Sequence, residues 1–192
     1  MTTTEPARRA RPRPRRGTTG KLGRTAQQYA GLGWPVFPLR PGDKVPLPGS
    51  HGCHDATTDE ATINRWWERH PEANIGAATG HVFDVLDIDG GGEAEAVIDA
   101  LWVGSAGPWP ADRKVLASIW DDGRVQLYGV ATGGCRTALM PGAHWVGIGG
   151  WVVIPPSAGG SGPLCAWANS PGCAPLVEWP EPVIALFRKG CK

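Results

Sequence analysis

The sequence lacks any apolar segment long enough to cross a bilayer, which takes roughly 20 consecutive and mostly apolar residues. Its first residues also lack the apolar run of a secretory signal. They contain an Arg-Arg pair, but the Pro-rich basic tract that follows does not fit a twin-arginine signal. These absences argue against a helical membrane protein and a secreted one. We therefore expect a soluble cytoplasmic protein with no membrane partner.

Paired metal-binding cysteines and a P-loop are also missing. The five cysteines are irregularly spaced and form no C-x-x-C pair, so reduced thiols are expected rather than a structural zinc site. The segment His51-Gly52-Cys53-His54 keeps one zinc interpretation open, although a second pair of ligands has no evident source. The absence of a G-x-x-x-x-G-K-[ST] sequence excludes a helicase motor within this sequence.

The net charge of +1 conceals a strongly basic N-terminal segment. Residues 1–24 contain eight of the 19 basic side chains and one of the 18 acidic ones, which leaves eleven basic and seventeen acidic side chains for the rest. The Thr, Pro and Arg content of this segment predicts a disordered arm. The arm is either a salt-sensitive contact to nucleic-acid phosphates or a solubilising extension. The first interpretation assigns DNA binding to Arg8, Arg9, Arg11, Arg13, Arg15 and Arg16.

Residues 25–190 are long enough for one domain with a packed core, to which the adjacent Trp66 and Trp67 are expected to contribute. A capping-box pattern at 57–60 predicts a helix that ends before Pro71. Further helices are expected at 24–32, 93–102 and 182–189. Strands are expected at 34–39 (at a sheet edge, because prolines interrupt it), 74–78, 82–89, 115–120, 124–131, 136–140 and 151–154, with mostly loop at 158–178. Helices mixed with strands in hairpin order predict an α+β domain.

Two acids stand at the end of the apolar strand expected at 82–89. Because strand side chains alternate, Asp87 and Asp89 share one face with Phe83 and Val85, whereas Asp84 lies on the other. Two like charges this close repel each other unless a cation lies between them. Carboxylates that open into a Gly-rich turn suit Mg²⁺ or Mn²⁺ bound together with a phosphate-bearing substrate. Solvated acids at a strand end remain the alternative interpretation.

Several motifs follow one another along residues 26–187: Gly33-Trp34-Pro35-Val36-Phe37-Pro38-Leu39 with Lys44, His51-Gly52, Asp55-Ala56-Thr57-Thr58-Asp59, Trp66-Trp67, His70-Pro71, Asn74-Ile75-Gly76, Ala78-Thr79-Gly80, Leu86-Asp87-Ile88-Asp89-Gly90 and Gly149-Gly150-Trp151-Val152-Val153-Ile154-Pro155-Pro156-Ser157. In this order they resemble the bifunctional DNA primase/polymerase (Prim-Pol) domain of the archaeo-eukaryotic primase superfamily. The resemblance implies a primase-like α+β fold with an RRM-like, mostly antiparallel sheet and flanking helices.

The resemblance also implies an activity, which is template-directed transfer of nucleotides in primer synthesis and extension. Asp87 and Asp89 match the family's D-h-D motif and would be the catalytic residues that hold two divalent ions, Mg²⁺ or Mn²⁺. The implied partners are a DNA template and primer and (deoxy)nucleoside triphosphates, with a separate helicase as a further candidate. The residues assigned to nucleotide binding are Lys44, Thr132, Gly133, Gly134, Arg136 and His144.

The sequence departs from the family pattern at two positions. The turn at 132–136 is followed by Thr137 where the family has a histidine that contacts the nucleotide, and His144 stands at about the position of a third carboxylate. A threonine is a poor substitute for an imidazole at a phosphate, and a histidine is a poor hard ligand for Mg²⁺. His144 or His81 could instead take over the nucleotide contact.

Three functional interpretations therefore remain open. The first is an active primase/polymerase that acts in the replication of a plasmid, phage or other mobile element. The second is a catalytically weakened or inactive module that binds nucleic acid or nucleotide. The third is a structural partner of a replicative helicase.

Overall fold

The computed structural model describes residues 20–90, 115–135, 137–159, 162–181 and 183–185. The basic arm, Arg136 and the helix expected at 93–102 lie outside these residues. The helix expected at 182–189 is described only at its start, where residues 181 and 183–185 are helical. No helix in the described ranges is both long and apolar enough to cross a membrane.

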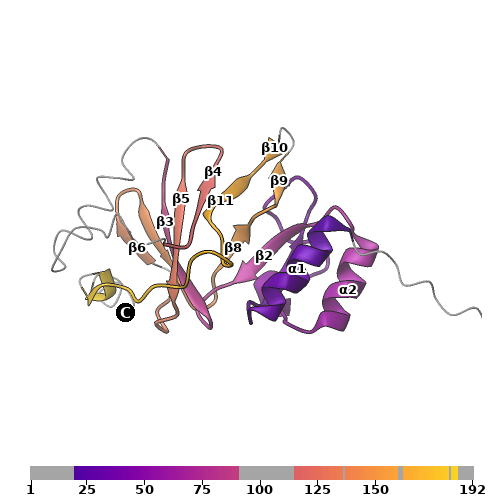
Figure 1. The fold of residues 1–192 in the computed structure, drawn as a ribbon, viewed down its shortest axis with the longest axis horizontal. Helices are drawn as coiled ribbons and strands as arrows, with labels where there is room; N and C mark the ends of the chain where they lie inside the picture. Colours follow the sequence, from indigo (N-terminus) through magenta and orange to yellow (C-terminus); the bar gives the residue numbers. More distant parts are fainter. Residues whose placement is uncertain (1–19, 91–114, 136, 160–161, 182, 186–192) are drawn as a thin grey trace, which may run out of the picture.

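Two helices pack side by side at one end of the molecule (Figure 1). Helix α1 (Lys21–Gly31) begins three residues earlier than expected and buries Ala26 and Tyr29. Helix α2 (Glu60–Arg69) ends before Pro71 as predicted and buries Ile63 and Trp67. Its N-cap is Asp59, whose side chain accepts a hydrogen bond from the Thr62 backbone N–H, which satisfies one of the free donors of the first turn.

A small antiparallel sheet adjoins the helices, with strand order β1-β2-β8. Strands β1 (Val36–Leu39), β2 (Asn74–Ala78) and β8 (Trp151–Ile154) match the expected segments closely. β1 lies at the edge of this sheet, as its proline content predicted. The short 3₁₀ helix η1 (Gly52–Asp55) lies between β1 and α2 in the chain.

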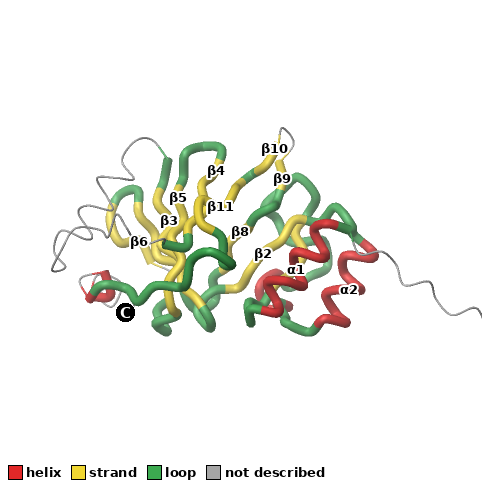
Figure 2. Tube along the Cα trace, viewed as in Figure 1, coloured by secondary structure: helices red, strands yellow, loops and turns green. Residues whose placement is uncertain are grey.

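A larger antiparallel sheet forms the other end, with the order β11-β4-β5-β3-β7-β6 among the described strands (Figure 2). Its bounds are β3 (Phe83–Ile88), β4 (Ala117–Trp120), β5 (Val125–Val130), β6 (Thr137–Met140), β7 (Ala143–Val146) and β11 (Cys165–Asn169). A hairpin of β9 (Ala158–Gly159) and β10 (Gly162–Pro163) connects β8 to β11. Helices segregated from mostly antiparallel sheets confirm the α+β prediction.

Two strands of the larger sheet were not predicted. β7 spans only four residues between Gly142 and Gly147, too few for its alternation to stand out from the glycine-rich surroundings. β11 lies in the segment expected to be mostly loop, and it pairs with β4 at the sheet edge. Its sequence Cys-Ala-Trp-Ala-Asn has few β-branched residues, so its strand conformation comes from pairing with β4 rather than from propensity.

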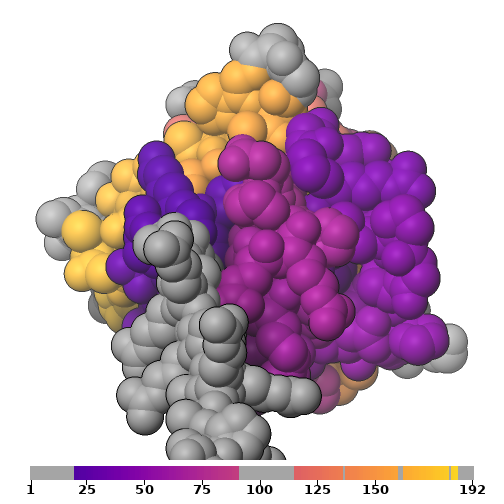
Figure 3. All heavy atoms as spheres, turned by 90° about the vertical axis from the view of Figure 1, so that its right-hand side faces the viewer, coloured from indigo at the N-terminus to yellow at the C-terminus, as the bar shows by residue number. Residues whose placement is uncertain are grey.

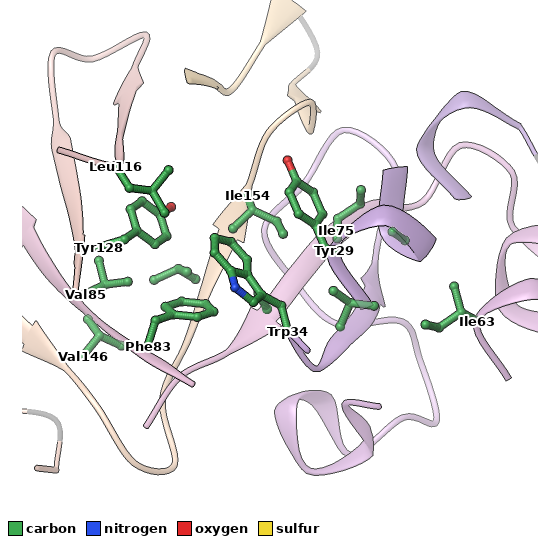
Figure 4. Close-up of a cluster of buried hydrophobic side chains, with 14 of the residues drawn as sticks. Tyr29, Trp34, Ile63, Ile75, Phe83, Val85, Leu116, Tyr128, Val146 and Ile154 are labelled. Carbon is green, nitrogen blue, oxygen red and sulfur yellow. The ribbon is translucent and has the colours of Figure 1, made fainter. Parts of the chain in front are cut away.

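Aromatic side chains join the helices to the larger sheet. The ring of Trp34 lies 4.3 Å from Phe83, 5.5 Å from Tyr29 and 6.0 Å from Tyr128, measured between ring centroids. Figure 4 shows Trp34 between the side chains of the two parts. The Tyr29 hydroxyl donates to the Pro155 carbonyl at 2.6 Å and accepts from Trp167 Nε1 at 2.7 Å. Residues near position 170 border a cavity together with α1, and in Figure 3 the yellow spheres of the late part of the chain adjoin the indigo spheres of α1.

The two faces of β3 have separate surroundings. Phe83 and Val85 belong to the aromatic core shared with the helices, and Leu86 and Ile88 pack on the other face with a second cluster that includes Trp145 and Trp179. The alternation predicted from the sequence is therefore correct. Asp84, on the second face, is fully buried, and its Oδ2 accepts hydrogen bonds from both the backbone N–H and the hydroxyl of Thr132.

The cysteines are only partly as expected. Cys53, Cys165 and Cys173 are free, in agreement with the prediction of reduced thiols. Cys135 is disulfide-bonded, so the prediction is wrong at that position. Sequence spacing cannot reveal which cysteines the fold brings together.

Gly90 allows the turn between β4 and β5 to pack against the end of β3. A Cβ atom at this position would lie 2.1 Å from the backbone oxygen of Asp122 and 3.0 Å from the backbone nitrogen of Arg124. Neither backbone atom can move without shifting the β4–β5 turn. Gly90 is therefore required by close packing.

We predict that Gly90→Ala lowers the free energy of unfolding by about 1–3 kcal/mol, because the added methyl group must displace backbone atoms. Chemical denaturation followed by circular dichroism measures this change. The matched control is Gly31→Ala at the end of α1, where a Cβ would meet nothing within 4 Å. It should leave stability unchanged or raise it by less than about 1 kcal/mol. Equal effects of the two substitutions would contradict the packing argument.

We also predict that Asp84 makes stability depend on pH. Burial raises the pKa of Asp84, and the two hydrogen bonds from Thr132 oppose this rise only in part. Because the folded protein holds the proton more tightly, wild-type stability should fall as the pH rises from about 4 through the raised pKa. Asp84→Asn has no carboxyl to titrate at this position. The free energy of unfolding of wild type relative to Asp84→Asn should therefore fall as the pH rises from about 4 through the raised pKa.

The control for this titration is Asp59, where the hydrogen bonds from Thr62 lower the pKa of the carboxyl. Its contribution to stability is present above the unfolded-state pKa and is lost as the pH falls, so the comparison with Asp59→Asn should slope in the opposite direction. Urea denaturation between pH 3.5 and 7 measures both slopes. Parallel pH profiles for wild type and Asp84→Asn would show that the buried carboxyl does not titrate as described.

Candidate functional site

Asp87 and Asp89 lie at the end of the central strand of the larger sheet. β3 pairs with β5 on one side and with β7 on the other, and this places Asp87 between Gln126 and His144. Directly opposed residues in antiparallel strands project to the same face. Asp87, Gln126 and His144 therefore form one polar row on the face that also carries Val85.

A second row lies one step further along the strands. Ile88 pairs with Val125, so Asp89 and Arg124 follow on the face of Asp87 and Gln126. Ser118 of β4 pairs with Gln126, so Trp120, two residues further along β4, projects to the same face. The Trp120 backbone N–H donates to the Arg124 carbonyl at 2.9 Å. Asp89 is fixed by its backbone N–H, which donates to the Gly142 carbonyl at 2.8 Å.

Four side chains of these rows line a cavity of about 190 Å³ between the larger sheet and β8. The larger sheet contributes polar and charged side chains, and β8 contributes an apolar wall. Lys44, from the turn after β1, reaches the same cavity. The lining residues are Lys44, Asp87, Trp120, Arg124, Gln126, Val146, Trp151, Val152 and Val153.

Burial and nearby charges act on Asp87 in opposite directions. Its side chain is 19% exposed, whereas that of Asp89 is 49% exposed. Burial raises the pKa of Asp87, and the charge of Arg124 and a hydrogen bond from Gln126 lower it. The negative charge of Asp89 raises it again. The net pKa is raised, so the ionised form of Asp87 would be favoured by an additional positive charge at this site.

The carboxylate oxygens of Asp87 and Asp89 are ligands of the kind that divalent cations such as Mg²⁺ prefer. The two acids supply these hard oxygens from alternate positions at the end of β3, which suits a Mg²⁺ or Mn²⁺ ion whose remaining ligands are water and substrate phosphates. His144 Nε2 lies 3.7 Å from Asp89 Oδ2. In the described part of the chain, no three His, Cys, Asp or Glu side chains are placed to hold a metal ion together.

Of the predicted nucleotide-binding residues, the fold brings Lys44 and His144 to the acids, and Lys44 also packs on an aromatic ring. Its Nζ lies 4.2 Å from the centre of the Trp120 ring, and Arg124 Cζ lies 5.5 Å from the same ring. Both distances are within the range of cation–π attraction. Trp120 therefore places two positive charges beside the cavity that Asp87 lines.

The turn at Thr132, Gly133 and Gly134 lies at the other end of β3. The Ala131 backbone N–H donates to the Val82 carbonyl, and Val82 lies five residue steps before Asp87, or roughly 16 Å at the usual rise. Thr132 is hydrogen-bonded to Asp84 on the opposite face. The fold thus separates this turn from the two acids. Arg136 and the six arginines of the arm lie outside the described residues.

The two positions that depart from the family pattern have different surroundings. His144 is paired with Asp87 and faces the same way. Thr137 pairs with Trp145, whose side chain belongs to the cluster on the opposite face. A side chain at 137 therefore does not face the row of Asp87. His81 precedes β3 and lines a different cavity with His54 and Cys53, so it is not near the acids.

Trp120, Arg124 and Gln126 are site residues that the sequence did not indicate. The turn at Asp121-Asp122-Gly123 was predicted, and it implies that the residues around it alternate on paired strands. Which face they share with Asp87 depends on the pairing of β5 with β3, two strands separated in the chain by residues 89–124. No local pattern encodes that register.

The comparison with known proteins agrees with this architecture. A family model described as bifunctional DNA primase/polymerase, N-terminal, matches residues 26–182. No curated protein is significantly similar to the chain. The family match extends from α1 to the start of the last described helix and includes both acids, Lys44 and His144. The chain therefore belongs to the family of bifunctional DNA primase/polymerase N-terminal domains.

Proposed function

We propose that this chain is a DNA primase/polymerase that adds nucleotides to a primer on a DNA template. The observation that carries the proposal is that Asp87 and Asp89 share one face at the end of β3, where their charges interact, and that Asp87 lines a cavity together with Lys44 and Arg124. Paired acids next to basic side chains suit a reaction in which phosphate oxygens and divalent ions must lie close together.

Each residue has a distinct part in this proposal. Divalent ions held by Asp87 and Asp89 would activate the primer hydroxyl and neutralise charge on the triphosphate. Gln126 Nε2 donates to Asp87 Oδ1 at 3.3 Å and so orients that carboxylate. Lys44 places a positive charge at the edge of the cavity, where it attracts phosphate. Trp151 and Val153 form an apolar wall that limits water in the cavity.

A second candidate function follows from His144. At the position of the family's third carboxylate, this side chain supplies an imidazole nitrogen rather than a hard anionic oxygen. Loss of one anionic ligand would weaken the binding of divalent ions. It would also reduce the stabilisation of the transition state, and each 1.4 kcal/mol of that stabilisation corresponds to about tenfold in rate. This observation favours a module that binds nucleotide or nucleic acid with weakened or no catalysis.

We further propose that residues 25–190 form one Prim-Pol-like domain, which the family match over 26–182 supports, and that the arm at 1–24 contacts DNA. A separate helicase partner, and a role in replicating a plasmid, phage or other mobile element, rest on the family resemblance alone.

We predict that the purified protein extends a primed template with labelled deoxynucleotides in Mn²⁺ and that Asp87→Asn lowers the rate at least about a hundredfold, because a metal-binding carboxylate is lost. The control is Glu68→Gln, which removes an exposed carboxylate on α2 and should extend like wild type. Product formed at the wild-type rate by Asp87→Asn would refute the proposed site. Nucleotide binding without any wild-type extension would favour the second candidate.

We predict that the arm gives single-stranded DNA binding most of its dependence on salt. Because α1 begins at Lys21, a deletion of residues 1–19 removes the six arginines without cutting into the helix. If all six contact phosphates, the slope of log K against log salt should become shallower by about 4. Fluorescence anisotropy at several salt concentrations measures this slope. A variant with all six arginines replaced by glutamine controls for arm length, and an unchanged slope in both would exclude the arm from DNA binding.

A further inference from the structure

Two buried hydrogen-bond donors at the cavity are unsatisfied. Arg124 Nε and Trp120 Nε1 are both inaccessible to water and, within the described residues, neither has a hydrogen-bond partner. Buried donors in folded proteins are nearly always paired, because an unpaired one costs about 1–3 kcal/mol. Both side chains line the cavity that Asp87 also lines. The described residues therefore offer these two donors no acceptor.

Arg124 directly precedes β5, and the two charge contacts that its guanidinium makes with described residues are both long. Its Nε lies 3.9 Å from Asp87 Oδ1, and an Nη2 atom lies 3.8 Å from Asp122 Oδ2. Both distances are too long for hydrogen bonds, so these are charge interactions only. The side chain is 30% exposed and lies against the Trp120 ring. A positioned guanidinium without hydrogen bonds from its Nε is well suited to bind an oxyanion.

The charges and the size of the cavity narrow the class of ligand. Lys44 and Arg124 bring two positive charges to the same Trp120 ring, next to the carboxylate of Asp87. The volume of about 190 Å³ is below the roughly 300–1,000 Å³ that encloses a whole small ligand. These features fit the phosphate end of a nucleotide, with its sugar and base outside the cavity.

We propose that Arg124, supported by Trp120 and acting with Lys44, binds the triphosphate of the incoming nucleoside triphosphate. This inference rests on the proposed function, since it assigns a substrate contact within the same site. Arg124 follows on the face of Asp87, whereas position 137 lies on the opposite face of the sheet. A nucleic-acid backbone also carries phosphates, but one charge at each phosphate matches two clustered cations less well than a triphosphate does.

The test compares how wild type and Arg124→Gln bind deoxyadenosine with zero, one, two or three phosphates. Isothermal titration calorimetry in Mg²⁺ without template or primer measures binding in the absence of turnover. Wild-type affinity should rise with each added phosphate. Arg124→Gln should bind dATP roughly ten- to a hundredfold more weakly, which is the usual value of hydrogen bonds to a charged group, and should bind deoxyadenosine as wild type does.

Three further variants sharpen the comparison. Trp120→Phe keeps an aromatic ring but removes the indole N–H, and it should weaken dATP binding severalfold. Arg124→Lys keeps the positive charge but lacks the planar guanidinium, and it should bind dATP with an intermediate affinity. It also provides a second test of the contact if Arg124→Gln folds poorly. Arg65→Gln removes an exposed arginine of α2, whose guanidinium contacts Thr62, and should bind dATP like wild type.

The outcomes separate this inference from the proposed function. If wild type extends primers and Arg124→Gln still binds dATP like Arg65→Gln, the inference is overturned and the proposed function stands. If Arg124→Gln weakens binding of a single-stranded oligonucleotide but not of dATP, the contact is to the nucleic-acid backbone and the inference is overturned. If wild type does not extend primers but loses phosphate-dependent binding on Arg124→Gln, the inference stands without the catalytic proposal.

Discussion

The antiparallel pairing of β3 with β5 and β7 is the constraint on which the candidate site depends. The register places Asp87 between Gln126 and His144 and sends Leu86 and Ile88 to the opposite face. A slip by one residue would exchange the two faces of β3. It would place Asp87 in the apolar cluster of Trp145 and Trp179 and an apolar side chain in the polar row, so the packing that stabilises the sheet also fixes the position of the acids.

The site carries features that reduce stability. Burial raises the pKa of Asp87, and among the described residues the Nε of Arg124 and the indole N–H of Trp120 have no hydrogen-bond partner. Such costs are tolerated where the remaining fold is well packed, and here the aromatic contacts of Trp34 join the larger sheet to the helical end. Binding of ions and phosphate, as proposed, would relieve both the unpaired donors and the disfavoured carboxylate, as expected of a site preorganised for a charged substrate.

Much of the fold could be predicted from the sequence, because its signals are local. The apolar strand that ends in Asp87 and Asp89, the β4–β5 turn and the stop of α2 before Pro71 each follow from alternation or from turn and proline chemistry. The strands β7 and β11 could not be predicted, since pairing with β3 and β4 rather than composition makes them strands. Arg124 was not predicted as a site residue, because its position depends on the pairing of β5 with β3. The turn at Thr132 was predicted to bind nucleotide, but it lies at the opposite end of β3 from the two acids.

The central claim is that Asp87 and Asp89 together bind divalent cations with a nucleotide beside them. Titration of Mn²⁺ followed by electron paramagnetic resonance tests it most directly, because the signal of free Mn²⁺ decreases as the ion is bound. The account predicts that wild type binds Mn²⁺ more tightly when dATP is present and that the double variant Asp87→Asn/Asp89→Asn loses both the binding and its dependence on dATP. Equal Mn²⁺ binding by the two proteins, with or without dATP, would contradict the account.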